Sequence, residues 1–255
     1  MDDSRRHSAE QNRRRIIQNK VASRLLGSTA AIPTGFAALD QALGIGGFPR
    51  GAITELFGPP AIGKTTLALQ WVAQAQESGQ SAAWIDAEHT FDAAYAIALG
   101  VSLERLPLAK PETAEQAIEM ARRLALSQAV DALVVDSAAA LVPQAEMESG
   151  LAGGPDLQAR VLASGLRSLA RAVVKTDTAI LFLNQLRSRM TPAGRESGET
   201  TAGGPALKLY AAVRLVLESG AGRTVCFRTL KNKAAGAFAE GVLRRAEGPG
   251  FAKTP

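Results

Sequence analysis

The sequence predicts an α/β fold: a mostly parallel central sheet flanked by helices, with extra antiparallel strands at its C-terminal edge. Between residues 52 and 184, short apolar segments alternate with longer helical segments, and parallel strands need such crossover helices. Beyond Tyr210 the helical segments stop and three strand-like segments follow one another, which favours an antiparallel extension of the sheet. The 255 residues, 46% hydrophobic and 21% charged, can bury a sizeable core.

The predicted elements follow from local patterns along the chain. Helices are expected from Lys64, near Asp92–Leu99, across Thr113–Ser127, where Thr113 and Gln116 have capping-box spacing, and near Leu157–Val174. The predicted strands are Ala52–Phe57, Ala82–Asp86, Ala132–Asp136, Ala179–Asn184, Val213–Glu218, Thr224–Leu230 and Gly241–Arg244.

Composition excludes several classes of protein. No apolar run approaches the roughly 18–20 residues of a membrane span, and the first residues contain no apolar signal core. The single cysteine, Cys226, cannot form an internal disulfide and agrees with a reducing compartment. We therefore expect a cytoplasmic protein without membrane contact.

Positive charge is concentrated at both ends of the chain. The formal net charge of +5 divides into +4 for residues 1–27, −4 for residues 28–222 and +5 for residues 223–255. Such basic ends suit a polyanion or an acidic neighbouring subunit. Solvated tails that keep the protein soluble are the alternative.

Three regions are expected along the chain. Residues 1–29 form a basic N-terminal arm, in which Ile17, Val21 and Leu25 predict an amphipathic helix over residues 9–26. Residues 30–245 form the core, and residues 246–255 are expected to be a flexible tail. Within the core, Glu146–Pro155 and Arg187–Pro205 are predicted to be long functional loops at the sheet edge where α/β proteins bind ligands.

The most specific motif is a phosphate-binding loop. Residues 58–65 fit GxxxxGK[ST], and they lie between an apolar strand and a helix. Glycines let backbone N–H groups point at phosphates, Lys64 reaches the β- and γ-phosphates, and the Thr65 hydroxyl ligates Mg²⁺. The predicted ATP-binding residues here are Gly58, Pro59, Pro60, Ala61, Ile62, Gly63, Lys64, Thr65 and Thr66.

Two carboxylates complete the predicted catalytic constellation. Asp136 ends an apolar strand and is the expected second Mg²⁺ contact, through water. Glu88, just beyond the strand that ends at Asp86, is the candidate for activating the attacking water. A surface carboxylate at a strand end is the alternative for Glu88.

Together the motifs resemble the ATPase core of the bacterial RecA recombinase family. In order they are GPPAIGKTT, IDAEH, VVDSAAALVP, LNQLR, ETTAGGPALKLYAAVRL and LKNKAAGAF, within residues 30–240. The resemblance implies a RecA-like P-loop NTPase fold, Mg²⁺ and ATP as ligands, single-stranded DNA as partner, self-association into a filament and homologous pairing in DNA repair and the damage (SOS) response.

The resemblance also implies roles for individual residues. Glu88 is similar to the family's catalytic carboxylate, and Gln185 to the polar sensor that links the γ-phosphate to the DNA loops. Asp92 and Tyr95 match residues on the adenine side. Lys231 and Lys233 match a catalytic pair that reaches the neighbouring protomer's ATP. A buried satisfied amide is the alternative for Gln185, and a solvated strand face the alternative for the two lysines.

The two long segments match the family's DNA-binding loops. Arg160 lies at the exit of the first, and Arg187, Arg189, Gly203 and Gly204 lie in the second. The bland alternative is ordinary loop solvation of the arginines.

The chain departs from the family pattern at several points. We expect the family's C-terminal domain to be absent and the N-terminal segment to be shorter than usual. No tyrosine stands where the family caps the adenine, and Leu209 replaces an aromatic residue linked to subunit packing. These changes leave the ATPase constellation complete.

Three functions therefore remain open. The first is an ATP-dependent recombinase. The second is an accessory paralogue in translesion mutagenesis, with a recombinase filament or a translesion polymerase as partner and weak or no ATPase activity. The third is a ring ATPase acting on protein, which the LKNK and ETTAGG segments disfavour.

Overall fold

The computed structural model describes residues 30–149, 154–190 and 196–253. The chain divides into two units, residues 1–30 and 31–255. The predicted helix over residues 9–26 lies outside the described residues, and the fold below is that of the second unit.

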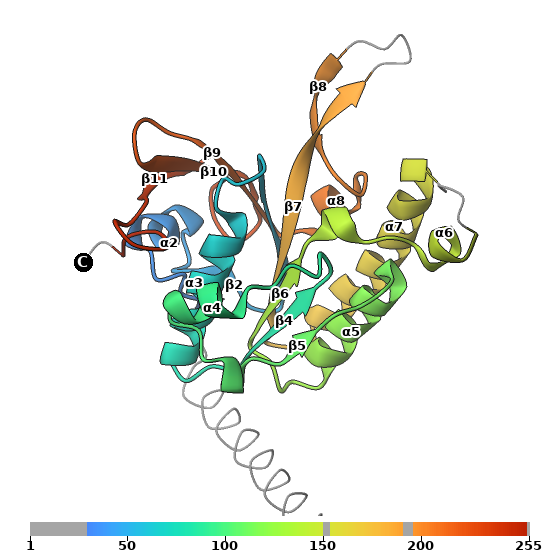
Figure 1. Ribbon diagram of the computed structural model, residues 1–255, viewed down its shortest axis with the longest axis horizontal. Coiled ribbons are helices and arrows are strands. Elements are labelled where there is room, and N and C mark those ends of the chain that lie inside the picture. Colours follow the sequence, from blue (N-terminus) through green and yellow to red (C-terminus); the bar gives the residue numbers. More distant parts are fainter. Residues whose placement is uncertain (1–29, 150–153, 191–195, 254–255) are drawn as a thin grey trace, which may run out of the picture. The chain divides into compact units, whose positions relative to one another are not determined.

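A central sheet organises this unit (Figure 1). In the described residues its strands run in the order β11-β10-β9-β3-β7-β6-β4-β5, and β8 pairs with β7 off this path. From β9 through β3, β7, β6 and β4 to β5, neighbouring strands are parallel. Strand β10 pairs antiparallel with β9, β11 pairs antiparallel with β10, and β8 pairs antiparallel with β7. Their bounds are β3 Ala52–Gly58, β4 Ala82–Asp86, β5 Leu108–Ala109, β6 Ala132–Asp136, β7 Ala179–Met190, β8 Glu196–Thr201, β9 Val213–Ser219, β10 Thr224–Asn232 and β11 Glu240–Arg244.

Helices cover both faces of the sheet. Helices α2 (Ala37–Leu43), α3 (Lys64–Glu77) and α4 (Ala93–Ala98) contribute to one apolar core, and α5 (Ala114–Leu126), α7 (Gly154–Val173) and α8 (Ala206–Tyr210) to the other. The short helix α6 is Gln144–Ser149, and β1 (Ala31–Ile32) pairs with β2 (Phe48–Pro49) in a separate ribbon.

Alternation along each strand produces the two cores. Within β6, Val134 packs into the first core, while Leu133 and Val135 pack into the second. A strand apolar on both faces is what a sheet covered on both sides requires. The structure thus confirms the predicted fold class, including the bounds of β4 and β6.

The prediction of one long loop over Arg187–Pro205 is wrong in part, because two strands extend into this segment. Strand β7 continues to Met190, and β8 returns beside it as an antiparallel hairpin that projects from the sheet (Figure 1). Because residues 187–201 are mostly polar, they carry no apolar alternation from which a strand could be predicted. Helix α8 then begins at Ala206, directly after the segment.

Two other expectations need correction. The first predicted loop, Glu146–Pro155, is partly helical, because α6 extends to Ser149 and α7 begins at Gly154. The predicted flexible tail is anchored at one residue: Phe251 is 2% exposed and bridges to Arg245, while residues 247–249, 252 and 253 are exposed. One aromatic side chain in a short segment rich in glycine, proline and alanine is too weak a pattern to predict this packing.

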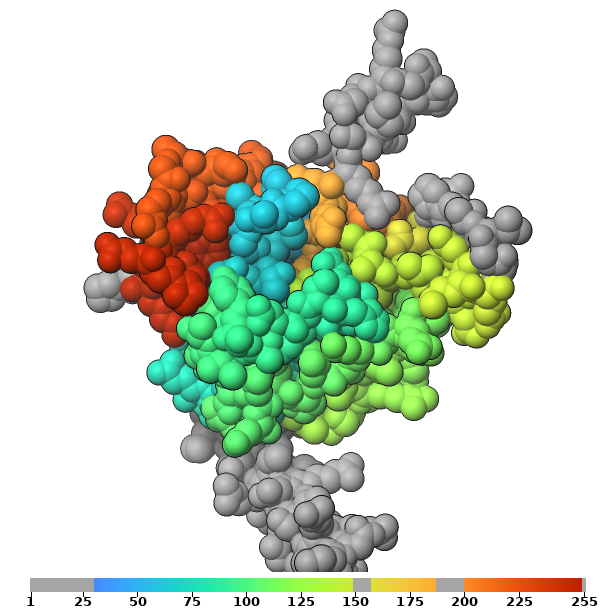
Figure 2. All heavy atoms as spheres, in the orientation of Figure 1, coloured from blue at the N-terminus to red at the C-terminus, as the bar shows by residue number. Residues whose placement is uncertain are grey.

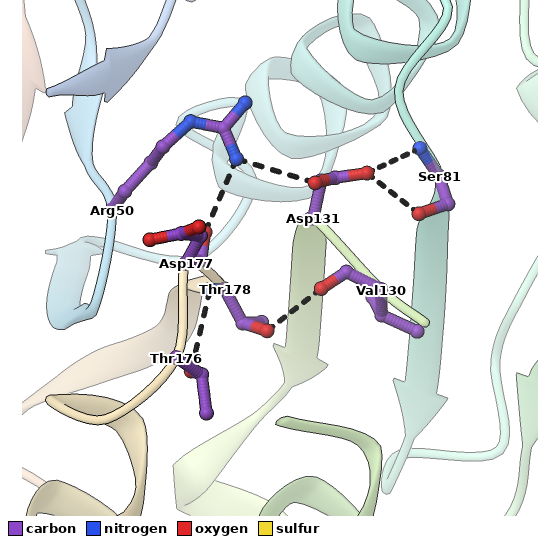
Figure 3. Close-up of polar contacts among 7 residues, drawn as sticks. All are labelled: Arg50, Ser81, Val130, Asp131, Thr176, Asp177 and Thr178. Carbon is purple, nitrogen blue, oxygen red and sulfur yellow. Dashed lines mark hydrogen bonds and ion pairs between the residues drawn. The ribbon is translucent and has the colours of Figure 1, made fainter. Parts of the chain in front are cut away.

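A polar cluster ties together the edge of the sheet where β4, β6 and β7 begin (Figure 3). The guanidinium of Arg50 donates to Asp131 Oδ1 at 3.3 Å and to the Asp177 carbonyl at 3.1 Å. The other carboxylate oxygen of Asp131 accepts from the Ser81 amide and hydroxyl at 2.9 and 2.7 Å. We call Arg50, Ser81, Asp131 and Thr178 the amino-edge cluster; Thr178 donates to the Val130 carbonyl at 2.7 Å.

Candidate nucleotide-binding site

The glycine-rich loop connects the end of β3 to the start of α3. Strand β3 ends at Gly58, and α3 begins at Lys64 with Gly63 as its N-cap residue, at φ 111°. That backbone angle favours glycine. The loop therefore places the free N–H groups of the first turn of a 14-residue helix at the carboxyl edge of the sheet, as anion binding requires.

Lys64 folds back over its own loop. Its ammonium donates to the carbonyls of Gly58 and Pro59 at 3.0 and 2.7 Å. Burial lowers the pKa of Lys64, and the charges of Asp136 and Glu88 partly offset that effect. A half-buried cation held by weak carbonyl partners is suited to exchange them for phosphate oxygens.

Thr65 and Asp136 form the candidate metal position. The Thr65 hydroxyl donates to Asp136 Oδ2 at 3.1 Å. Burial, then the negative charge of Glu88, raises the pKa of Asp136 to about 7. A hydroxyl and a carboxylate without a full counter-charge fit Mg²⁺, which takes one or two protein oxygens and completes its shell with phosphates and water.

Glu88 lies at the centre of the carboxyl edge. Its carboxylate accepts a hydrogen bond from the Ser137 hydroxyl and another from Gln185 Nε2 at 3.2 Å. Asp86, at the end of β4, accepts from the backbone amides of Thr90 and Phe91 at 3.2 and 3.1 Å and so shapes the turn that carries Glu88. The predicted catalytic carboxylate and the predicted sensor are thus brought into contact.

Of the two residues predicted for the adenine side, Tyr95 contacts the start of α3. Tyr95 and Thr66 share a hydrogen bond between their hydroxyls at 2.9 Å. The exposed Asp92 caps α4, because its carboxylate accepts from the Tyr95 amide at 2.9 Å. This cap orients the helix that carries Tyr95.

A buried polar network extends from Gln185 into the sheet. The side-chain oxygen of the neighbouring residue, Asn184, accepts from the backbone N–H of Gln185 at 2.9 Å. The side-chain nitrogen of Asn184 donates to Glu55 at 2.8 Å and to the Ala202 carbonyl at 3.1 Å. Glu55 is 0% exposed and pairs with Arg214 at 2.5 Å. The network joins the site to the residue that follows β8 and to β9.

This network was missed from the sequence, although a signal was present. Glu55 stands inside the apolar run ITELF and Arg214 inside VRLVL. Two opposite charges in two strands that are otherwise apolar predict a buried pair, because neither charge is tolerated alone. Ser137, by contrast, carries no such signal.

The two lysines of the predicted pair lie in different environments. Lys231, in β10, donates to the carbonyls of Lys208 and Leu209 at 2.9 and 3.0 Å, in the last turn of α8. Its pKa is lowered by partial burial and by the charges of Lys233 and Arg214. Lys233 is exposed. Lys231 thus has an internal partner that the sequence did not reveal.

The predicted DNA-contacting residues occupy different environments. Arg187 pairs with Thr200 in the β7–β8 hairpin, and Arg189 lies at an irregularity of the same ladder. Arg160 is exposed on α7. Gly203 and Gly204, at φ 79° and 71°, pack against α7: an added Cβ would lie 2.4 Å from Leu162 Cδ1 and 2.8 Å from Ala159 Cβ respectively. Both glycines therefore allow the hairpin's return to lie close to α7.

The described residues include no further metal cluster and no helix that could span a membrane. In that part of the chain, no group of three or more His, Cys, Asp or Glu residues could hold a metal ion by itself. None of the described helices has both the length and the apolar character needed to cross a membrane.

Fold and loop together define a P-loop protein of the RecA-like α/β class. A family model described as the RecA N-terminal domain matches residues 5–243, and the chain belongs to this family. The resemblance drawn from the six motifs is thereby confirmed.

Similar proteins cover most of the chain. Protein RecA of Nitratidesulfovibrio vulgaris strain DP4 is 44% identical over 236 residues, 88% of this chain and 65% of that protein. Protein RecA of Deinococcus radiodurans is 47% identical over 233 residues, 86% of this chain and 63% of its own length. Protein RecA of Xylella fastidiosa strain M12 is 43% identical over 247 residues, 92% and 71% respectively. The chain thus spans a little under two thirds of the length of the first two.

Proposed function

We propose that this protein binds Mg²⁺ and ATP at the P-loop and hydrolyses the nucleotide. Lys64 would exchange its carbonyl partners for phosphate oxygens, and the amides of residues 58–66 would surround the phosphates. Thr65 and Asp136 would hold Mg²⁺, which when bound neutralises phosphate charge. The half-buried Lys64, whose pKa burial lowers, and the buried Asp136, whose pKa burial raises, support this assignment.

In the proposed reaction Glu88 orients and polarises the attacking water. Its carboxylate already has two hydrogen-bond donors, Ser137 and Gln185. A γ-phosphate beside Gln185 would compete for the same amide, so that nucleotide binding changes the hydrogen bonding of Glu88. The departing phosphate charge would be stabilised by Lys64 and, in an assembled form, by Lys231 and Lys233 from a neighbouring protomer.

We further propose that the ATPase serves DNA recombination, with the protein self-associated on single-stranded DNA for homologous pairing and repair in the cytoplasm. The observation that carries this proposal is the contact of Glu88 with Gln185, directly at the base of the β7–β8 hairpin. A strand bound by this hairpin would bias Gln185 and hence hydrolysis. The family resemblance supports the choice of DNA as the polymer.

An ATPase assay with and without single-stranded DNA tests the proposal. We expect DNA to raise the turnover of the wild-type protein at least about tenfold, and Gln185→Met to lose the stimulation while binding nucleotide normally. Arg122→Ala on α5, which pairs with Glu119 on the surface, is a matched control. Hydrolysis that ignores DNA in a well-folded wild-type protein would contradict the recombinase and favour the accessory role.

The lysine pair offers a second test. Lys233→Ala should lower DNA-stimulated hydrolysis and leave nucleotide binding by the monomer intact, because an exposed lysine acts only across an interface. Lys231→Ala should also lower stimulated hydrolysis and in addition loosen α8, whose carbonyls it caps. Loss of monomer nucleotide binding in Lys233→Ala would contradict the interface role.

A further inference from the structure

The C-terminal segment 245–253, here called the strap, is fastened to α3 behind the P-loop. The side-chain amide of Gln70 pairs with both backbone groups of Phe251: Gln70 Oε1 accepts from the Phe251 amide at 2.8 Å, and Gln70 Nε2 donates to the Phe251 carbonyl at 2.9 Å. In Figure 2 the red C-terminal segment lies directly beside the cyan segment of α3. Phe251 is thereby held in a defined position.

The ring of Phe251 lies against Gly63, the P-loop residue that directly precedes α3. A Cβ added to Gly63 would lie 2.7 Å from Phe251 Cζ and 3.2 Å from Cε2. Phe36 also packs edge-on against this ring, with centroids 6.3 Å apart. A fixed, 2% exposed ring at this distance limits where the Gly63 backbone can lie.

Arg245 holds the preceding residue of the P-loop. Its Nη2 donates to the Ile62 carbonyl at 3.1 Å, and its guanidinium lies 5.8 Å from the centroid of the Phe251 ring. Two strap residues thus contact two consecutive residues of the loop, and they also contact each other.

The strap is closed on itself by backbone hydrogen bonds. The Ala246 amide donates to the Gly250 carbonyl at 2.9 Å, and the Ala252 amide to the Arg244 carbonyl at 2.8 Å. Gly250 has φ 89°, and a Cβ added to it would lie only 2.7 Å from Leu99 Cδ2. The strap therefore has a turn of its own, anchored to the end of β11.

We propose that Phe251 and Arg245 are positioning residues for phosphate binding, because they hold Ile62 and Gly63 in the anion-binding conformation. A loop ordered before the ligand arrives does not lose its conformational freedom on binding, and affinity rises accordingly. The inference rests on the nucleotide site proposed above, and it assigns the strap a part in that site.

Nucleotide affinity of full-length variants tests the proposal, with a fluorescent N-methylanthraniloyl-ATP plus Mg²⁺ as the probe. We expect the Kd to rise about tenfold in Phe251→Ala and about fivefold in Arg245→Met, with Phe251→Leu between the wild type and Phe251→Ala. In steady-state assays KM should rise while kcat is retained. Lys253→Met is the matched control, because Lys253 belongs to the strap but contacts Gln74 and Glu77 on α3.

Hydrogen exchange of the ligand-free protein separates positioning from general stability. The amides of residues 62–65 should exchange faster in Arg245→Met, while those of β6 remain protected. Unchanged Kd and unchanged loop exchange in both Arg245→Met and Phe251→Leu would overturn the inference, even if Phe251→Ala does not fold. A wild-type protein that binds no nucleotide would instead refute the proposed function.

Discussion

Charged groups are stabilised differently at the two ends of the parallel strands, the amino edge where the strands begin and the carboxyl edge where they end. At the amino edge, Arg50 and Asp131 form an ion pair at 3.3 Å, and Asp131 accepts two further hydrogen bonds from Ser81. At the carboxyl edge, burial lowers the pKa of Lys64 and raises that of Asp136 to about 7. At the first edge the two charges are paired within the chain, although Arg50 Nε is buried without a hydrogen-bond partner. The second edge is prepared for an external charge.

This difference separates stability from activity within one sheet. Satisfied polar groups lower the free energy of the folded state, and their loss exposes a desolvation cost. At the ligand site, burial instead disfavours the charged forms of Lys64 and Asp136, and a bound ligand and metal would offset that cost. Substitutions at the amino edge should therefore change unfolding, and substitutions at the carboxyl edge should change turnover.

Lys64→Ala should give the largest effect and test the carboxyl edge. We expect ATP turnover to fall more than about 100-fold, because the phosphate charge loses its main cation. Circular dichroism and the urea midpoint should stay near the wild-type values, since Lys64 contacts only loop carbonyls in the ligand-free protein. Full activity in this variant would refute the site.

Asp131→Ala should be the strongest change at the amino edge. It leaves the Arg50 charge without its carboxylate and the Ser81 donors without an acceptor, which should cost about 2–4 kcal/mol in the free energy of unfolding. Urea denaturation measures this loss. Asp131→Asn, which keeps an acceptor oxygen, should lose less, and equal losses in the two variants would show that the charge is the only contribution.

The raised pKa of Asp136 predicts a pH dependence of the ligand-free protein. Burial and Glu88, helped by Asp86, move this pKa from 3.8 to about 7, while Thr65 and Lys64 oppose the shift. The folded protein therefore holds the proton more tightly than the unfolded chain does. The contribution of Asp136 to stability is complete below about pH 4 and is lost as the pH rises to about 7, with a slope of at most about 1.4 kcal/mol per pH unit.

Asp136→Asn isolates that contribution because asparagine does not titrate. The difference in unfolding free energy between the wild type and this variant, measured by urea denaturation from pH 4 to 8, should change across this window and level off above it. Parallel curves for the two proteins would show that Asp136 keeps an ordinary pKa.

Thr178→Val should have the smallest effect and sharpen the description of the amino edge. The substitution keeps the shape of the side chain but removes the buried hydrogen bond to the Val130 carbonyl. A loss of about 1 kcal/mol in the free energy of unfolding is expected, with unchanged ATP turnover. Reduced turnover at a temperature where the variant is fully folded would contradict the separation of the two edges.

The elements that could be predicted are those whose sequence carries a repeating physical signal. Strands β4 and β6 are each four apolar residues followed by an aspartate, and the predicted bounds agree with the structure to the residue. The β7–β8 hairpin could not be predicted, because its residues are mostly polar. For the site, Lys64, Thr65 and Asp136 follow from the spacing of one motif and one strand end. The partnership of Glu88 with Ser137 and Gln185 joins three segments far apart in the chain.

By itself, the sequence determined the sheet with its two covered faces and the phosphate loop, since both depend on the order of residues within short segments. Only the tertiary structure decided that Asn184, Glu55 and Arg214 form one buried network and that Phe251 lies against Gly63. These contacts join residues up to 188 positions apart, as Gly63 and Phe251 show. Which side chain meets which at such separation depends on strand order and on packing, and neither is encoded in a local pattern.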